Sequence, residues 1–109
     1  MYEQAIAKVK EYMDTQLPAM NSVYPNYLFD IRAYSRWAAS EIIERLIEED
    51  SKLPPHITGK EPMPEIDIIQ DFIDETEYYS CMVTDPNMEK MFTIACNTGK
   101  YIKCLFLKH

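Results

Sequence analysis

Proline and glycine are concentrated in one segment near the middle of the chain. Four of the seven prolines and one of the two glycines lie within residues 51–64. Proline fixes φ, lacks an N–H group and disfavours helix at the residue before it, so no continuous helix can cross this segment. Because the sequence on both sides has helical periodicity, the segment predicts a chain divided into two helical halves.

The totals favour an all-α fold in one domain. A chain of 109 residues with 47% apolar and 27% charged residues is globular in composition and long enough for a core. Two glycines are too few for the many tight turns of an all-β fold. We expect a four-helix bundle, built as two helical hairpins joined by the proline-rich strap, with helices at about residues 2–17, 27–50, 64–83 and 86–106.

Apolar spacing and helix-start signals support these bounds. The first helix has apolar residues at spacings of three and four, and Pro18 follows its last residue, Leu17. The second has an apolar stripe wide enough to touch more than one neighbour. Pro64 and the Asp85–Pro86 pair are typical of helix starts, since proline suits the first turn and aspartate caps it.

The C-terminal segment has two readings. Met88, Phe92, Ala95, Ile102 and Leu105 have helical spacing, which predicts a fourth helix. Residues 91–96 and 101–107 are also rich in β-formers and are joined by the turn-like residues 97–100, which leaves a β-hairpin at 91–107, and hence an α+β fold, as the alternative. An isolated two-stranded hairpin is marginally stable, and the sequence offers no third strand.

The proline segment is long for a connection in a domain of this size. Long connections are functional or mobile, and proline-rich ones are stiff. We therefore expect an ordered strap lying on the bundle, anchored by Leu53, Ile57 and Met63.

The net charge indicates which binding partners are disfavoured, and the cysteine content indicates the redox state of the cellular compartment. A net charge of −7 disfavours direct binding to nucleic acid or to an anionic membrane surface. No apolar run reaches membrane-spanning length, and the polar N-terminal residues lead us to expect no signal peptide. Three cysteines without Cys-x-x-Cys spacing predict reduced thiols, so we expect a cytoplasmic protein, from a bacterium or a mobile element.

The motifs of catalysis and metal binding are absent from the sequence. Asp67, Asp71 and Asp74 share one helix face, but the chain has neither an EF-hand loop nor a Glu-x-x-His pair. Thr-Gly-Lys occurs at residues 58–60 and 98–100 without the rest of a P-loop, which predicts turn or helix-end positions. The sequence therefore predicts no metal, cofactor or catalytic residue, and leans against an enzyme.

One group of side chains is a candidate for an interaction surface. Arg32, Tyr34, Arg36 and Trp37 combine the aromatic and guanidinium groups that anchor interfaces. Their alternative role is structural, with the aromatics closing the core. Tyr78 and Tyr79 are adjacent on a helix and must point in two directions, so we expect one buried and one exposed.

Three functions remain open. We favour a small acidic interaction or regulatory module without catalytic activity, which binds another protein or itself. The first alternative is an acidic nucleic-acid mimic that uses Asp67, Asp71 and Asp74 to bind a DNA- or RNA-binding protein. The second is a ligand-binding or enzymatic bundle, with a pocket where Arg32, Arg36 and carboxylates of residues 64–83 converge.

Overall fold

The part of the chain that the structure describes is an all-α bundle of four helices. The computed structural model describes residues 2–17, 28–52, 57, 59 and 61–107. The first helix comprises α1 (Glu3–Glu11) and the π-helical η1 (Tyr12–Gln16), and it is followed by α3 (Leu28–Asp50), α5 (Glu65–Met82) and α6 (Pro86–Leu107). The described residues contain no strand. The predicted fold class is confirmed.

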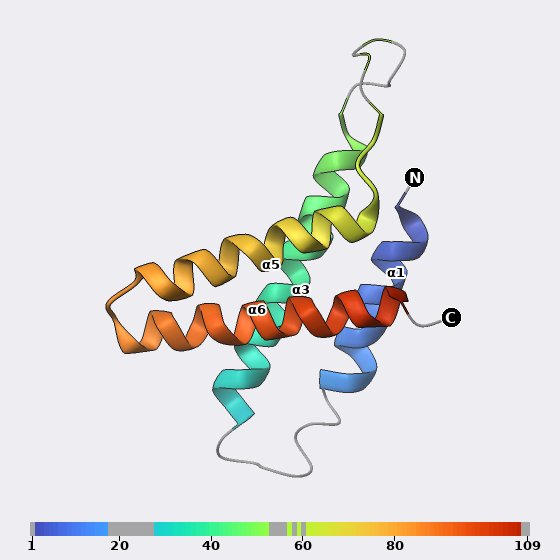
Figure 1. Cartoon of the computed structure of the whole chain (residues 1–109). Coiled ribbons are helices and arrows are strands. Elements are labelled where there is room, and N and C mark those ends of the chain that lie inside the picture. The colour runs from blue at the N-terminus through green and yellow to red at the C-terminus, as the bar shows by residue number, and fades with distance from the viewer. Residues whose placement is uncertain (1, 18–27, 53–56, 58, 60, 108–109) are drawn as a thin grey trace.

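The antiparallel α5–α6 hairpin lies across α3 and the first helix (Figure 1). A short turn joins the two helices, and the Asp85 carboxylate accepts a hydrogen bond of 2.9 Å from the Asn87 N–H, as the capping signal predicted. Figure 1 shows that this turn projects beyond α3, while the C-terminal end of α6 lies near α1. One end of the hairpin is therefore covered by other helices and the other end is not.

The β-hairpin alternative for residues 91–107 is wrong, because this whole stretch belongs to α6. Ala95, Cys96, Gly99 and Ile102 form a buried helical face. A two-stranded hairpin would have had no third strand to cover it. Thr98 and Gly99 lie in the middle of α6, so the expectation of a turn or helix end at residues 98–100 is also wrong.

All four helices contribute to one apolar core. Its large side chains with less than 2% exposure are Val9, Leu17, Ile42, Leu46, Ile69, Phe72 and Ile102. Gly99 allows α6 to approach α5 closely, since a Cβ built there would lie 2.9 Å from Ile73 Cγ1 and 3.3 Å from Phe72 Cδ2. The helix pair that carries this contact is the most extensively packed pair in the molecule.

The proline segment meets the bundle at its C-terminal end. Met63 is half-buried against the core, and its carbonyl accepts a hydrogen bond of 2.6 Å from the Tyr2 hydroxyl. Ile57 is 61% exposed, so its predicted role as an anchor is wrong. Leu53, the third predicted anchor, lies outside the described residues. Gly59 has φ of +74°, a backbone conformation that glycine adopts at no steric cost.

None of the described helices combines sufficient length with sufficient apolar character to cross a bilayer.

Candidate functional site

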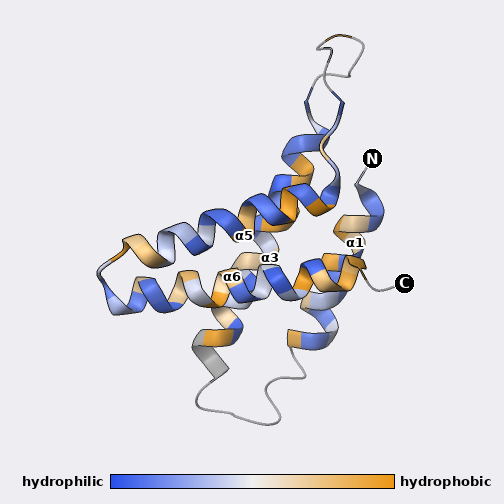
Figure 2. Ribbon diagram, in the orientation of Figure 1, coloured by the Kyte–Doolittle hydropathy of each residue, from blue (hydrophilic) through white to orange (hydrophobic). Residues whose placement is uncertain are grey.

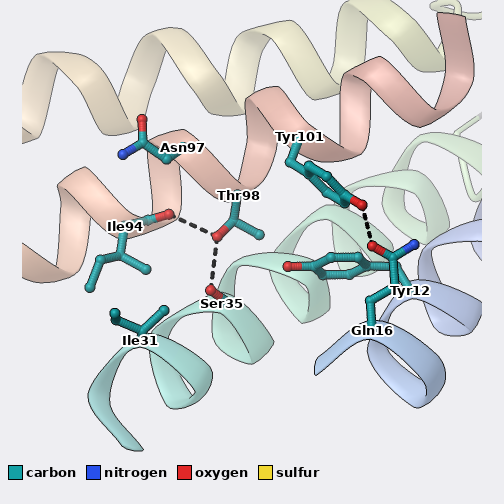
Figure 3. A pocket seen from close by; sticks show the side chains of 8 residues that line it. All are labelled: Tyr12, Gln16, Ile31, Ser35, Ile94, Asn97, Thr98 and Tyr101. Carbon is teal, nitrogen blue, oxygen red and sulfur yellow. Dashed lines mark hydrogen bonds between the residues drawn. The ribbon is translucent and has the colours of Figure 1, made fainter. Parts of the chain in front are cut away.

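A pocket opens between η1, α3 and α6 (Figure 3). Its volume is about 480 Å³, and its lining residues are Tyr12, Gln16, Ile31, Ser35, Ile94, Asn97, Thr98 and Tyr101. Each of the three helical segments supplies at least two of them.

The η1 wall has π-helical geometry. The Leu17 N–H donates to the Tyr12 carbonyl five residues earlier, which is the i→i+5 bond of a π-helix. This segment places Tyr12 and Gln16 in the same pocket wall. Single π-turns inside helices occur frequently at functional sites, so the position of η1 favours this pocket as a candidate functional site.

Two buried hydroxyl groups connect α3 and α6 at the centre of the pocket. The Thr98 hydroxyl lies 3.0 Å from the Ser35 hydroxyl and 2.8 Å from the Ile94 carbonyl. Thr98 has a single hydroxyl proton, so when it donates to Ile94 its oxygen can accept from Ser35. A polar centre is thus held within a largely apolar helix interface.

Two tyrosines form the other side of the pocket. The rings of Tyr12 and Tyr101 have centroids 5.6 Å apart, and the Tyr101 hydroxyl donates to Gln16 Oε1 (Figure 3). Burial raises the pKa of Tyr12 above its usual value of 10.0, although hydrogen bonding with Ser35 and Thr98 opposes part of this rise. Tyr12 therefore remains a neutral phenol throughout the physiological pH range.

The predicted aromatic and arginine cluster lies on α3, outside this pocket. Trp37 is 38% exposed and its ring packs against Phe72 of α5, with centroids 6.3 Å apart. Arg36 is exposed, while Arg32 and Tyr34 are half-buried. The interaction role of these four residues stays a prediction.

The predicted acidic face lies on the exposed side of α5. Asp67, Asp71 and Asp74 are all exposed, and Asp74 accepts a hydrogen bond of 2.8 Å from Gln70. Among the described residues, no three histidine, cysteine or acidic side chains are grouped so that they could hold a metal ion. The role of this face as a nucleic-acid mimic stays a prediction.

Apolar side chains are exposed at the free end of the α5–α6 hairpin. Tyr78, Tyr79, Met82 and Met88, called the tip surface below, have exposures of 60%, 42%, 60% and 44%. The Tyr79 ring contacts those of Tyr78 and Phe92, with centroids 5.7 and 5.4 Å away. Figure 2 shows hydrophobic residues at the end of α5, where the hairpin projects. The expectation that one of Tyr78 and Tyr79 is buried is wrong, because both are exposed and no other helix of the described residues covers this end.

Sequence reasoning found neither the pocket nor the tip surface. A signal for the pocket was present, since Ser35 interrupts the apolar stripe of residues 27–50 and Thr98 lies within the apolar phase of residues 86–106. Polar residues at core positions require partners, which they find here in each other. Two of its residues did carry a signal, because Tyr78 and Met82 follow the polar face of residues 64–83 at helical spacing from Asp74, where large apolar side chains are exposed.

Comparison with protein-family models, curated proteins and solved structures found no match to this chain.

Proposed function

We propose that this chain is a small acidic interaction or regulatory module without catalytic activity, and that its tip surface binds a basic amphipathic helix of another protein. The observation that carries this proposal is the exposure of Tyr78, Tyr79, Met82 and Met88, each between 42% and 60%, at the uncovered end of the α5–α6 hairpin. Contiguous exposed apolar side chains commonly mark protein-interaction sites.

The residue types of the tip surface suit an interface. Aromatic residues and methionine are enriched where proteins bind one another, because they offer large contact areas. Methionine also adapts its shape to different partners. An amphipathic helix presents a continuous apolar stripe, which suits contact with exposed aromatic and methionine side chains.

The charges around the tip surface favour a cationic partner. Residues 74–90 contain five acidic side chains, namely Asp74, Glu75, Glu77, Asp85 and Glu89, and one lysine, Lys90. The five carboxylates are exposed. Complementary charge accelerates association and excludes partners of the same sign, so a second copy of this acidic chain fits less well.

The cysteines support a reducing compartment. Cys81 and Cys104 are exposed and free, and Cys96 is free and buried. Exposed free thiols are typical of the cytoplasm, where thiols are kept reduced. We therefore place the proposed interaction in the cytoplasm.

A synthetic peptide tests the proposal directly. A fluorescein-labelled amphipathic helix of leucine and lysine should bind the protein, as measured by fluorescence anisotropy. The same pattern with glutamate in place of lysine should bind at least about tenfold more weakly, because its charges repel the tip. The double variant Tyr78→Ser and Met82→Ser should weaken binding of the lysine peptide by about tenfold or more, because it removes apolar contact area.

Two control variants locate the binding surface. Ile47→Ser removes an apolar side chain that is 54% exposed on α3 and should leave peptide affinity unchanged. Trp37→Ser tests the predicted α3 cluster and should also leave the peptide affinity unchanged. Equal binding of both peptides, or a loss of binding in Trp37→Ser but not in the tip double variant, would contradict the proposal.

A further inference from the structure

We propose that the pocket between η1, α3 and α6 binds a small uncharged molecule with an apolar body and one hydroxyl or amide group. This site is separate from the tip surface, because no residue of the tip surface lines it. The inference therefore does not depend on the proposed protein interaction.

The size of the pocket fits a small molecule. Its volume of about 480 Å³ falls within the range of roughly 300–1,000 Å³ that is usual for small-molecule sites. Such sites combine apolar walls with a few convergent polar groups. Here Ile31, Ile94 and the rings of Tyr12 and Tyr101 supply apolar surface, and the hydroxyls of Ser35 and Thr98 lie between them (Figure 3).

The lining residues select against charged ligands. None of the eight described lining residues is acidic or basic, so none of them offers an ionic partner to a charged ligand that loses water here. Burying an unpaired charge costs far more than burying a hydrogen-bonded neutral group. The ligand is therefore neutral.

The central hydroxyl groups define where the polar group of the ligand lies. Figure 3 shows the Tyr12 hydroxyl pointing towards Ser35 and Thr98. Tyr12 and Ser35 are buried, at 6% and 3% exposure, and a hydroxyl group both donates and accepts. Their protons already serve the bonds among these hydroxyls and to the Ile94 carbonyl, so a ligand hydroxyl or amide N–H would donate to the remaining oxygen lone pairs. The apolar body of the ligand would lie against Ile31 and Ile94.

Three probes of similar size test the inference. Phenol is neutral with a hydroxyl group, benzene lacks the hydroxyl, and benzoate is charged. In a titration of the full chain followed by ¹⁵N–¹H NMR, phenol should shift the amide signals of Ser35, Ile94 and Thr98 in a saturable manner. Benzene should bind more weakly than phenol, and benzoate should leave these signals in place.

Matched threonine variants provide the control. Thr98→Val removes the buried hydroxyl while keeping the shape, so it should reduce the affinity for phenol about fivefold and leave that for benzene unchanged. Thr93→Val alters an exposed position of the same helix and should bind phenol like the unaltered chain. The double variant of the tip surface should also bind phenol with unaltered affinity, which separates this site from the tip surface. Circular dichroism checks that Thr98→Val is folded.

Three results would overturn the inference. They are the absence of saturable shifts with phenol, equal binding of phenol and benzoate, and phenol binding by folded Thr98→Val at unaltered affinity and selectivity.

Discussion

Gly99 controls how closely α5 and α6 approach each other. A methyl group at this position would lie 2.9 Å from Ile73 Cγ1 and 3.3 Å from Phe72 Cδ2. Ile73 and Phe72 are 2% and 1% exposed, so neither side chain can move aside freely. Glycine is therefore needed here for close helix packing. Its low helix propensity is tolerated because packing against the neighbouring helices stabilises α6.

Gly99→Ala is expected to destabilise the protein. Alanine improves helix propensity by up to about 1 kcal/mol, whereas overpacking a core costs about 1–3 kcal/mol. Because the neighbours are buried, we expect the free energy of unfolding to fall by about 1–2 kcal/mol in urea titrations. Lys100→Ala alters the adjacent exposed position and should change it by less than about 0.5 kcal/mol. A Gly99→Ala variant as stable as the unaltered chain would show that the interface can relax.

Among the helices, Phe72 of α5 is a contact point for side chains of α3. Its ring lies beside that of Trp37 and beneath the Arg45 guanidinium, which is 5.2 Å from the ring centroid. Arg45 also donates a hydrogen bond of 2.7 Å to Glu75. One arginine thus combines a cation–π contact with an ion pair between the two helices.

The Arg45–Glu75 pair is expected to contribute modestly to stability. Both side chains are partly exposed, at 28% and 47%, and exposed pairs contribute about 0.2–1 kcal/mol. A double-mutant cycle of Arg45→Gln and Glu75→Gln should give a coupling free energy in this range, and about 1 M salt should reduce it. The control is the i,i+3 pair Lys52–Glu49, which does not connect two helices. Its coupling free energy should lie at the lower end of the same range. A coupling above about 2 kcal/mol would contradict the expectation.

At the scale of the whole molecule, the first helix is joined to the rest by contacts at several points. Tyr2 donates a hydrogen bond to the Met63 carbonyl, Lys8 lies 5.0 Å from the Phe106 ring centroid, and Tyr12 packs against Tyr101. Burial raises the pKa of Tyr2, and the carboxylates of Glu49, Asp50 and Glu65 raise it further. The pKa of Tyr12 is also raised, first by burial. The Tyr2 hydroxyl must stay protonated to donate to the Met63 carbonyl.

Alkaline pH is expected to destabilise this arrangement. Since the pKa of each phenol is higher in the folded chain than the usual 10.0, the folded state keeps protons that the unfolded state loses. The stability from this difference is fully present below pH 10 and is lost as pH rises through the folded-state pKa. The free energy of unfolding should therefore fall above about pH 10, and less steeply in Tyr12→Phe and Tyr2→Phe. Tyr78→Phe, at an exposed position, should keep the slope of the unaltered chain.

Local patterns in the sequence predicted the fold class and the start of α6. Helical spacing, scarce glycine and the start signal at Asp85–Pro86 are local properties, and local hydrogen bonding and side-chain periodicity suffice to express them. The broad apolar stripe of residues 27–50 likewise predicted a central helix, and α3 contacts both the first helix and the α5–α6 pair.

Tertiary structure decided which polar and apolar residues became surface, core or pocket. Tyr79 and Phe92 follow the same periodic pattern as core residues, yet they lie beyond the reach of α3 at the free end of the hairpin, where Tyr79 remains 42% exposed. Ser35 and Thr98 are 63 positions apart and meet only because α6 crosses α3. Periodicity in the sequence indicates which face of a helix is apolar. It does not indicate how much of the helix length a neighbouring helix covers. The crossing of the helices therefore created the pocket and the tip surface.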